Sequence, residues 1–291
     1  MTLPLISVIV PAYNHSAFIE RALQSVVEQS YRPIELVVID DGSTDDTAAL
    51  CQDFLSRYMP SATFLKRQNR GAAYTINQGI ALSSGDYINV LNSDDIFHPN
   101  RMARCLSRIV KGKSELLFTN VGFVDEVGEV APRDQYIDGL REAEVNVGRL
   151  PSLGFGFLRN QLAISTGNLF FSRNLYNRVG PFCNYRYVHD WDFVLRSLYY
   201  NEPSCLAEEL YYYRLHGSNS FKSLADVAGY ETTELMRNFL HSMVSKLPEN
   251  GLAPSPHYWP GVFEHYMMLW NYQDYLPPRH RSAFVDLVRI T

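Results

Sequence analysis

Short apolar runs rich in β-branched residues alternate with segments of helical period through the first 120 residues of the chain. Such runs predict buried strands, because they are too short for helices and are bounded by turn-forming residues. Strands that alternate with helices through short connections form a mostly parallel sheet with helices on both faces. We therefore expect an α/β fold with strands at 6–10, 34–39, 62–66, 87–91 and 115–119, and helices that begin near residues 14, 43, 71 and 99.

Polar residues gather where three of these strands end. They are Tyr13 and Asn14 after the first strand, Asp40 and Asp41 after the second, and Asn92, Ser93, Asp94 and Asp95 after the fourth. Because ligands bind beyond the carboxyl ends of parallel strands, these clusters predict a binding site at one edge of the sheet. The last cluster suits a hard divalent cation, and the second could accept hydrogen bonds from a base or ribose. Helix caps and Asx turns are the alternative interpretation of both.

The second half of the chain departs from this alternation. Residues 124–130 predict a hairpin with its turn near Gly128, and residues 131–160 predict loops or a lid over the site. The loop after residue 216 is a second candidate lid. From residue 223 onward, apolar segments separated by prolines predict a helical extension. The other elements expected in this half are a strand at 164–171 interrupted by Gly167, a helix at 189–200, a strand at 210–215, and helices at 224–247, 258–274 and 279–289.

Two single residues in this half could carry chemistry. Asp190 stands at the start of an expected helix, where it either stabilises the helix dipole or serves as a general base. His216 follows an apolar strand in a loop of Gly, Ser and Asn residues, where it is either a surface hydrogen-bonding group or a ligand. The residues alone leave both pairs of alternatives open.

Charge and cysteine spacing exclude several classes of protein. The 26 Lys and Arg residues against 31 Asp and Glu residues give a formal net charge of −5, which argues against a general nucleic-acid binder. The four cysteines include no CxxC pair, which excludes a zinc ribbon or thioredoxin motif and predicts free thiols. A Rossmann dehydrogenase has little support, because no GxGxxG follows the first strand.

The hydropathy of the chain predicts a cytoplasmic protein. The first ten residues are apolar but lack a basic region, so no signal peptide is expected, and no apolar window is long enough for a membrane span. The aromatic segment 259–270 is expected to pack on the rest of the chain, because few basic residues accompany it. Peripheral association with the inner face of the plasma membrane is the alternative.

Eight short motifs occur in order along the chain. They are SVIVPAYN at 7–14, ELVVIDDGSTD at 35–45, NRGAA at 69–73, NQG at 77–79, SGDYI at 84–88, NSDD at 92–95, HDWD at 189–192 and YRLHGSNS at 213–220. As an ordered set they resemble the family 2 glycosyltransferases of the GT-A fold, over residues 5 to about 220. NSDD falls where that family carries its DxD motif, HDWD resembles its ED-type motif, and the last segment resembles its late metal-histidine segment. Asn92 and His189 depart from the Asp and Glu that are usual at these positions.

The resemblance implies a role for each matched residue. Asp94 and His216 would hold Mn²⁺ or Mg²⁺, and Asp190 would be the general base. The nucleotide-sugar site would comprise Pro11, Ala12, Tyr13, Asn14, Asp40, Asp41, Asn69, Arg70, Gly71, Asn92, Ser93 and Asp94. Residues near the donor sugar or the acceptor would be Asp95, Gly167, Asn168, His189 and Trp191. The catalytic domain would cover 1–222, with a nucleotide-binding half at 1–120 and an acceptor half at 121–222, followed by the extension at 223–291.

The activity that the resemblance implies is an inverting transfer of a hexose-type sugar from a UDP- or dTDP-sugar. The acceptor would be a hydroxyl of a glycan or lipid-linked glycan, in bacterial-type polysaccharide or O-antigen assembly. A metal ion would stabilise the diphosphate leaving group, and one carboxylate would take the proton of the acceptor. The alternatives are a non-catalytic sugar-nucleotide-binding protein, which Asn92 and His189 favour, and a nucleotidyltransferase, which would need a Gly-rich basic loop after the first strand.

Overall fold

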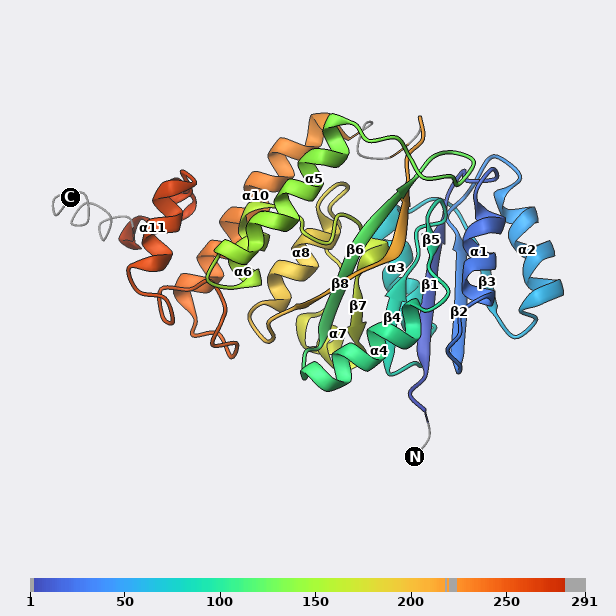
Figure 1. The fold of residues 1–291 in the computed structure, drawn as a ribbon, viewed down its shortest axis with the longest axis horizontal. Helices are drawn as coiled ribbons and strands as arrows, with labels where there is room; N and C mark the ends of the chain where they lie inside the picture. The colour runs from blue at the N-terminus through green and yellow to red at the C-terminus, as the bar shows by residue number, and fades with distance from the viewer. Residues whose placement is uncertain (1–2, 218, 220–223, 281–291) are drawn as a thin grey trace.

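The structure is a computed structural model that describes residues 3–217, 219 and 224–280 of the 291-residue chain. An eight-stranded sheet runs through its centre in the order β3-β2-β1-β4-β7-β6-β8-β5 (Figure 1). The strands are β1 Ile6–Ala12, β2 Ile34–Asp40, β3 Thr63–Lys66, β4 Tyr87–Val90, β5 Ile96–Phe97, β6 Leu116–Val124, β7 Phe170–Ser172 and β8 Ser204–Arg214. The α-helices are α1 Ile19–Val27, α2 Thr47–Tyr58, α3 Ala72–Ala81, α4 Arg101–Gly112, α5 Gln135–Asn146, α6 Leu153–Arg159, α7 Arg173–Val179, α8 His189–Ser197, α10 Ala225–Ser245 and α11 Val262–Leu269. The 3₁₀ turns are η1 Val147–Arg149, η2 Thr166–Asn168 and η3 Gln273–Tyr275.

Pairing within the sheet is mostly parallel. β1 pairs in parallel with β2 and β4, and β2 pairs in parallel with β3. β7 is antiparallel to both β4 and β6, β6 is parallel to β8, and the two-residue β5 is antiparallel to β8. The predicted α/β fold class is therefore confirmed, and β1, β2 and β4 end at the same edge with their polar clusters.

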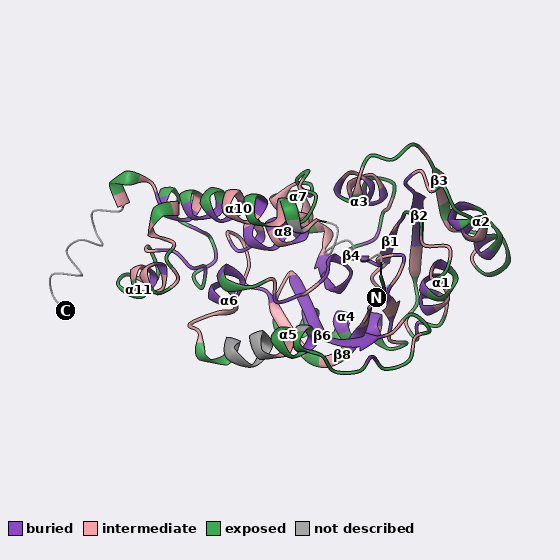
Figure 2. Cartoon of the chain, turned by 90° about the horizontal axis from the view of Figure 1, so that it is seen from above, coloured by how far each residue is buried: buried purple, intermediate pink, exposed green. Residues whose placement is uncertain are grey.

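Each face of the sheet has its own apolar core. Ile9 and Val37 point to one face and pack with residues of α3, α8 and α10, whereas Val8 and Val38 point to the other and pack with residues of α1, α2 and α4. Figure 2 shows the buried strands between these two layers of helices. The central strands β1 and β2 are apolar on both sides because both faces are covered, which is why they read as continuous β-branched runs.

The segment 131–160 is largely helical, so the prediction of loops there is wrong, whereas a lid over the site stays a prediction. It contains α5, η1 and α6, and it buries Ile137 in one core and Phe155 and Phe157 in the other. Four glycines in this segment favour a loop on propensity alone. Burial of the apolar side chains outweighs that preference, because packing supplies most of the stability of a helix in a folded protein.

The strand expected at 164–171 begins only at Phe170. Ile164 has a left-handed φ of 66°, and the 3₁₀ turn η2 follows, in which the Ser165 side chain accepts a hydrogen bond from the Gly167 amide. A Cβ at Gly167 would lie 2.1 Å from the Tyr211 hydroxyl. Gly167 therefore marks a close approach of the backbone to β8 and not an interruption within a strand.

Other expected elements are present with shifted ends. Val124 forms an antiparallel bridge with Val130, and Gly128 has a left-handed φ of 89°, so the predicted hairpin is confirmed. β1 continues past its expected end to Ala12, where it pairs with the last residue of β2. Strand β5 was not predicted, because two residues are too few to show a pattern.

The C-terminal helices share the core of one sheet face. Leu235 and Phe239 of α10 and Phe263 of α11 belong to the same apolar cluster as Ile88 of β4. The helix expected at 258–274 is divided, because α11 ends at Leu269 and Asn271 has a left-handed φ of 59° before η3. Most of the helix expected at 279–289 lies outside the described residues, which end at residue 280. Within the described part of the chain, none of the helices has the length and apolar character that a membrane crossing requires.

The packing of α3 against β1 predicts that Gly79→Ala destabilises the protein. A Cβ at Gly79 would lie 2.3 Å from Cγ2 of Ile9, so the helix or the strand must move. We expect the free energy of unfolding to fall by about 1–3 kcal/mol, measured by chemical denaturation. Gly112→Ala in the last turn of α4 is the control, because the nearest atom to its Cβ is 3.6 Å away. Equal effects of the two substitutions would contradict the close approach.

Candidate active site

A cavity of about 860 Å³ opens at the carboxyl ends of β1, β2 and β4. Its volume is in the range of small-molecule sites, and its walls contain residues from all three polar clusters and from the first turn of α8. The predicted site residues that line it are Pro11, Ala12, Tyr13, Asn14, Asp41, Asn69, Gly71, Asn92, Ser93, Asp94, His189, Asp190 and Trp191. The predicted residues outside this lining are Asp40, Arg70, Asp95, Gly167, Asn168 and His216.

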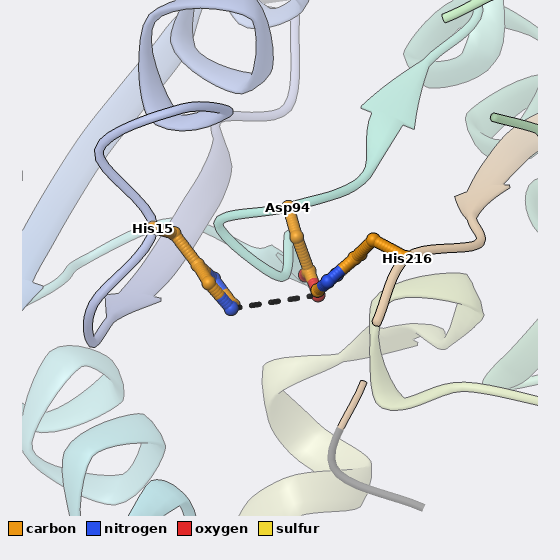
Figure 3. Close-up of side chains that lie close together, drawn as sticks. All are labelled: His15, Asp94 and His216. Carbon is orange, nitrogen blue, oxygen red and sulfur yellow. Dashed lines mark hydrogen bonds and ion pairs between the residues drawn. The ribbon is translucent and has the colours of Figure 1, made fainter. Parts of the chain in front are cut away.

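Asp94, which lines the cavity, lies between two histidines (Figure 3). Its Oδ2 is 3.0 Å from Nε2 of His216 and 3.7 Å from Nε2 of His15. One ligand atom from each of these three side chains lies within 4.8 Å of the others, so the group could hold a metal ion. The three residues follow β1, β4 and β8, so the cluster forms only when the sheet has assembled.

The two histidines control the charge of the Asp94 carboxylate. Burial would raise the pKa of Asp94, but the hydrogen bond with His216 and the charges of both imidazoles bring this pKa below its ordinary value. Nδ1 of His15 is 2.7 Å from Oγ of Ser93, which fixes the direction of its other nitrogen toward Asp94. The site therefore favours an ionised carboxylate beside two oriented imidazoles.

Sequence reasoning did not identify His15 as a site residue. It directly follows the Pro-Ala-Tyr-Asn segment at the end of β1. Its place next to these predicted site residues is the one local feature that could have indicated a role in the site. The partner Ser93 is 78 residues away in the chain, so no local pattern connects the two side chains.

Of the two neighbouring aspartates at the end of β2, the structure places Asp41 in the wall of the cavity. Its carboxylate accepts hydrogen bonds from the backbone amides of Arg70 at 2.9 Å and Gly71 at 2.8 Å, and it pairs with Arg67 at 2.5 Å. Asp40 is fully buried and accepts a hydrogen bond from the amide of Ser43. Asp41 thus shapes the wall that Asn69 and Gly71 line, whereas Asp40 lies behind it.

Asp95 also lies behind the cavity wall. Its carboxylate accepts hydrogen bonds from the Tyr211 hydroxyl, from the amide of Arg214 at 2.8 Å and from the side-chain amide of Asn92 at 3.1 Å. Burial and the negative charge of Asp94 raise the pKa of Asp95 well above its ordinary value. These contacts join the end of β4 to β8, so Asp95 holds the wall and Asp94 faces the cavity.

Gly167 and Asn168, expected near a sugar, belong to a buried network centred on Arg101. The Arg101 guanidinium donates to the side-chain oxygens of Asn89 and Asn168 and to the carbonyl of Gly167. Arg101 and Asn168 are fully buried. Gly167 and Asn168 therefore do not line the cavity, although the neighbouring Ser165 and Thr166 do.

Asp190, in the first turn of α8, also lines the cavity. Asp190 is 8% exposed, and burial raises the pKa of its carboxyl group although the charge of His189 lowers it. Nε2 of His189 is 3.1 Å from the hydroxyl oxygen of Thr166. The Trp191 indole donates a hydrogen bond to the Phe157 carbonyl at 2.7 Å. A buried carboxylate with a raised pKa at the wall of a cavity can accept a proton from a bound hydroxyl group.

The sequence pattern of one family, described as Glycosyl transferase family 2, matches residues 7–180. The chain is 34% identical over 128 residues to chondroitin synthase of Escherichia coli and 33% identical over 128 residues to an uncharacterized glycosyltransferase of Haemophilus influenzae. Both alignments cover 44% of this chain, but they span only 18% and 51% of the two relatives. An uncharacterized glycosyltransferase of Rickettsia prowazekii is 25% identical over 256 residues, which are 84% of this chain and 74% of that protein.

Two solved structures show the same fold. Residues 1–349 of S. aureus TarS in complex with UDP-GlcNAc match with a TM-score of 0.63 and 20% identity, over 90% of this chain and 71% of that chain. A mannosyltransferase of Pyrobaculum calidifontis in complex with GDP-Man and Mn²⁺ matches with a TM-score of 0.64 and 17% identity, over 91% of this chain and 72% of that chain. The predicted GT-A fold is confirmed by these neighbours.

The contacts of Asp41 predict a large loss of stability in Asp41→Asn. The substitution removes the charge that Arg67 pairs with and one of the acceptors of the Arg70 and Gly71 amides. We expect the free energy of unfolding to fall by about 3 kcal/mol in a denaturant titration, because a buried ion pair is broken. Asp53→Asn, which breaks the exposed ion pair with Arg57, is the matched control and should cost less than about 0.5 kcal/mol. A loss as small as that of the control would show that Asp41 does not support this wall.

Proposed function

This chain belongs to glycosyl transferase family 2 and is a glycosyltransferase, and we propose that it transfers a hexose-type sugar from a UDP- or dTDP-sugar to a hydroxyl of a glycan or lipid-linked acceptor. The observation that carries the proposal is that two chemical groups share one cavity. Asp94, which lies beside His15 and His216, and the buried carboxylate of Asp190 both line it. A sugar bound between them would have its diphosphate on one side and its acceptor on the other.

The cluster of His15, Asp94 and His216 fits a divalent cation. One carboxylate and two imidazoles are ligands that Mn²⁺ accepts, whereas Mg²⁺ prefers oxygen ligands and keeps its waters. The similar mannosyltransferase was solved with Mn²⁺, which supports the choice of Mn²⁺ here. When bound, the ion supplies positive charge to the diphosphate leaving group.

Asn92 replaces the first Asp of the family's DxD motif without removing a ligand from this cluster. Its side-chain amide donates to Asp95 at 3.1 Å and to the Ser165 hydroxyl at 2.8 Å. Asn92 therefore supports the residues behind the wall, and the change from Asp removes one negative charge from a place that already holds Asp94 and Asp95.

The nucleotide would lie along the ends of β1 and β2. Tyr13 is 46% exposed where it lines the cavity, so its ring is available to stack on a base. The wall of Asp41, Asn69 and Gly71 supplies polar groups for the base and ribose on the same side. Similar structures hold UDP, UDP-GlcNAc and GDP-Man, so the base is the first property of the donor to be measured.

Asp190 would act as the general base for the acceptor. The acceptor oxygen attacks the anomeric carbon as the bond to the diphosphate breaks, and its proton passes to Asp190. A single displacement of this kind inverts the anomeric configuration. Tyr185, Tyr187 and Trp191 line the cavity beside Asp190, and their rings offer apolar faces with polar edges to a glycan acceptor.

The metal cluster predicts that Mn²⁺ strengthens nucleotide binding. In calorimetric titrations of UDP, dTDP and GDP, we expect at least one nucleotide to bind at least about 10-fold more tightly with Mn²⁺ than without it, and Mg²⁺ to have a smaller effect. Asp94→Ala, His216→Ala and His15→Ala should each reduce the effect of Mn²⁺. His265→Ala, at an exposed position of α11, is the matched control. If none of the three nucleotides bound with either metal, the proposed donor class would be wrong.

The burial of Asp190 predicts how the reaction depends on pH. Asp190→Asn should lower kcat by about 10²- to 10⁴-fold while the Kd for UDP stays within about twofold, because only the proton acceptor is lost. In the native protein, burial raises the pKa of Asp190 above its ordinary 3.8, so activity should fall as the pH drops through this raised value and the carboxylate becomes protonated. A kcat that Asp190→Asn leaves unchanged would remove Asp190 from the mechanism.

A further inference from the structure

Helix α10 contacts a segment that lines the cavity through one buried carboxylate, that of Glu231. Its Oε1 accepts a hydrogen bond from the amide of Arg186 at 2.9 Å, and its Oε2 accepts from the amides of Tyr187 at 2.8 Å and Val188 at 3.3 Å. Glu231 is 8% exposed, and α10 lies beside α8 in both ribbon views (Figures 1 and 2). A carboxylate with so little access to water is stable there because three amides replace its hydration.

These three amides immediately precede α8. The residue at the N-terminal cap of α8 is Val188, whose apolar side chain cannot accept a hydrogen bond from the first turn. Glu231 places a negative charge at the same end of the helix from a different part of the chain, where the helix dipole favours it. Glu231 thus supplies the electrostatic part of a cap to α8, and it holds the backbone from which the helix starts.

The same segment forms the acceptor side of the cavity. Arg186, Tyr187 and Val188 line the cavity next to His189 and Asp190. Asn238, further along α10, donates to the Tyr185 hydroxyl at 3.4 Å, so α10 contacts this segment at a second point. The region that the family pattern matches ends at residue 180, so this arrangement belongs to the part of the chain beyond the shared pattern.

We propose that Glu231 is a positioning residue for the transfer reaction: it fixes the segment 186–188 and so sets the place of Asp190 and the shape of the acceptor side. This inference rests on the proposed role of Asp190 as general base. It gives the C-terminal helix a function in the reaction, because the catalytic wall depends on a side chain from α10. The nucleotide side of the cavity, built on the ends of β1, β2 and β4, does not touch Glu231 through any described hydrogen bond.

The first test compares Glu231→Gln with the native chain in two measurements. The probe for activity is the release of UDP from UDP-GlcNAc with water as acceptor: the water oxygen attacks the anomeric carbon, the bond to UDP breaks and the proton passes to Asp190. We expect kcat to fall by about 10- to 100-fold, since small displacements of a catalytic group have effects of this size. The KM for UDP-GlcNAc and the Kd for UDP should stay within about twofold, because Glu231 makes no described hydrogen bond to the nucleotide side of the cavity. The stoichiometry of UDP binding, which counts the folded sites, should stay within the same limit.

Two further variants separate positioning from general damage. Glu231→Asp keeps the charge and both acceptor oxygens and should recover part of kcat. Glu234→Gln removes a negative charge one turn further along α10 and should leave kcat unchanged. An unchanged kcat in Glu231→Gln, or a UDP stoichiometry that falls in proportion to kcat, would overturn the inference.

Hydrogen–deuterium exchange decides the inference without any substrate. In Glu231→Gln the amides of residues 186–188 should exchange about 10-fold faster, as expected when charge-assisted hydrogen bonds are lost, while the amides of β1 and β4 keep their rates. Unchanged exchange at 186–188 would overturn the inference whatever the activity. If the native chain releases no UDP but Glu231→Gln shows the expected faster exchange, the proposed donor is contradicted. The role of Glu231 in holding residues 186–188 is then still supported.

Discussion

The hydrogen bonds of Asp95 are the contacts on which the shape of the cavity depends. Its carboxylate joins the end of β4 to β8 through the Tyr211 hydroxyl and the Arg214 amide. Because Asp95 is held behind the wall, the adjacent Asp94 must face forward, where His15 and His216 meet it. Two neighbouring carboxylates thus acquire opposite environments: burial and a like charge raise the pKa of Asp95, and two imidazoles lower that of Asp94. Asp95 joins the segment after β4 to β8, and Asp94 keeps a negative charge beside the two histidines.

Local patterns predicted the sheet well, because both of its faces are covered and its strands are therefore continuous apolar runs. The ends of β1, β2 and β4 could be located to within about two residues, and with them the edge where the polar clusters gather. The segment 131–160 could not be predicted, since its glycines suggest a loop and only the tertiary burial of Phe155 and Phe157 makes it helical. The turn at 166–168 likewise depends on Tyr211, which lies 44 residues beyond Gly167 in the chain.

The site was predicted less completely than the fold, because it depends even more on contacts between residues that are distant in the sequence. Motif order predicts Asp94, His216 and Asp190 as site residues, but which predicted residues line the cavity depends on neighbours far away in the sequence. Asp40 and Asp41 illustrate this: adjacent residues of equal chemistry separate into one behind the wall and one in it, and only the loop at 69–71 distinguishes them. His15 was missed because its partners lie on the turn after β4 and in the segment after β8.

The group of His15, Asp94 and His216 also has a consequence for stability. His216 and Asp94 are separated by 122 residues of chain, and His15 follows β1, the first strand along the chain. A cation shared by them would close two long loops, in the way that a disulfide constrains an unfolded chain. The loss of loop entropy grows only slowly with loop length, but here both loops are long and both are closed by one atom. The ion that serves the chemistry would then also fasten the sheet, so that the resistance of this enzyme to unfolding would follow the supply of metal in its surroundings.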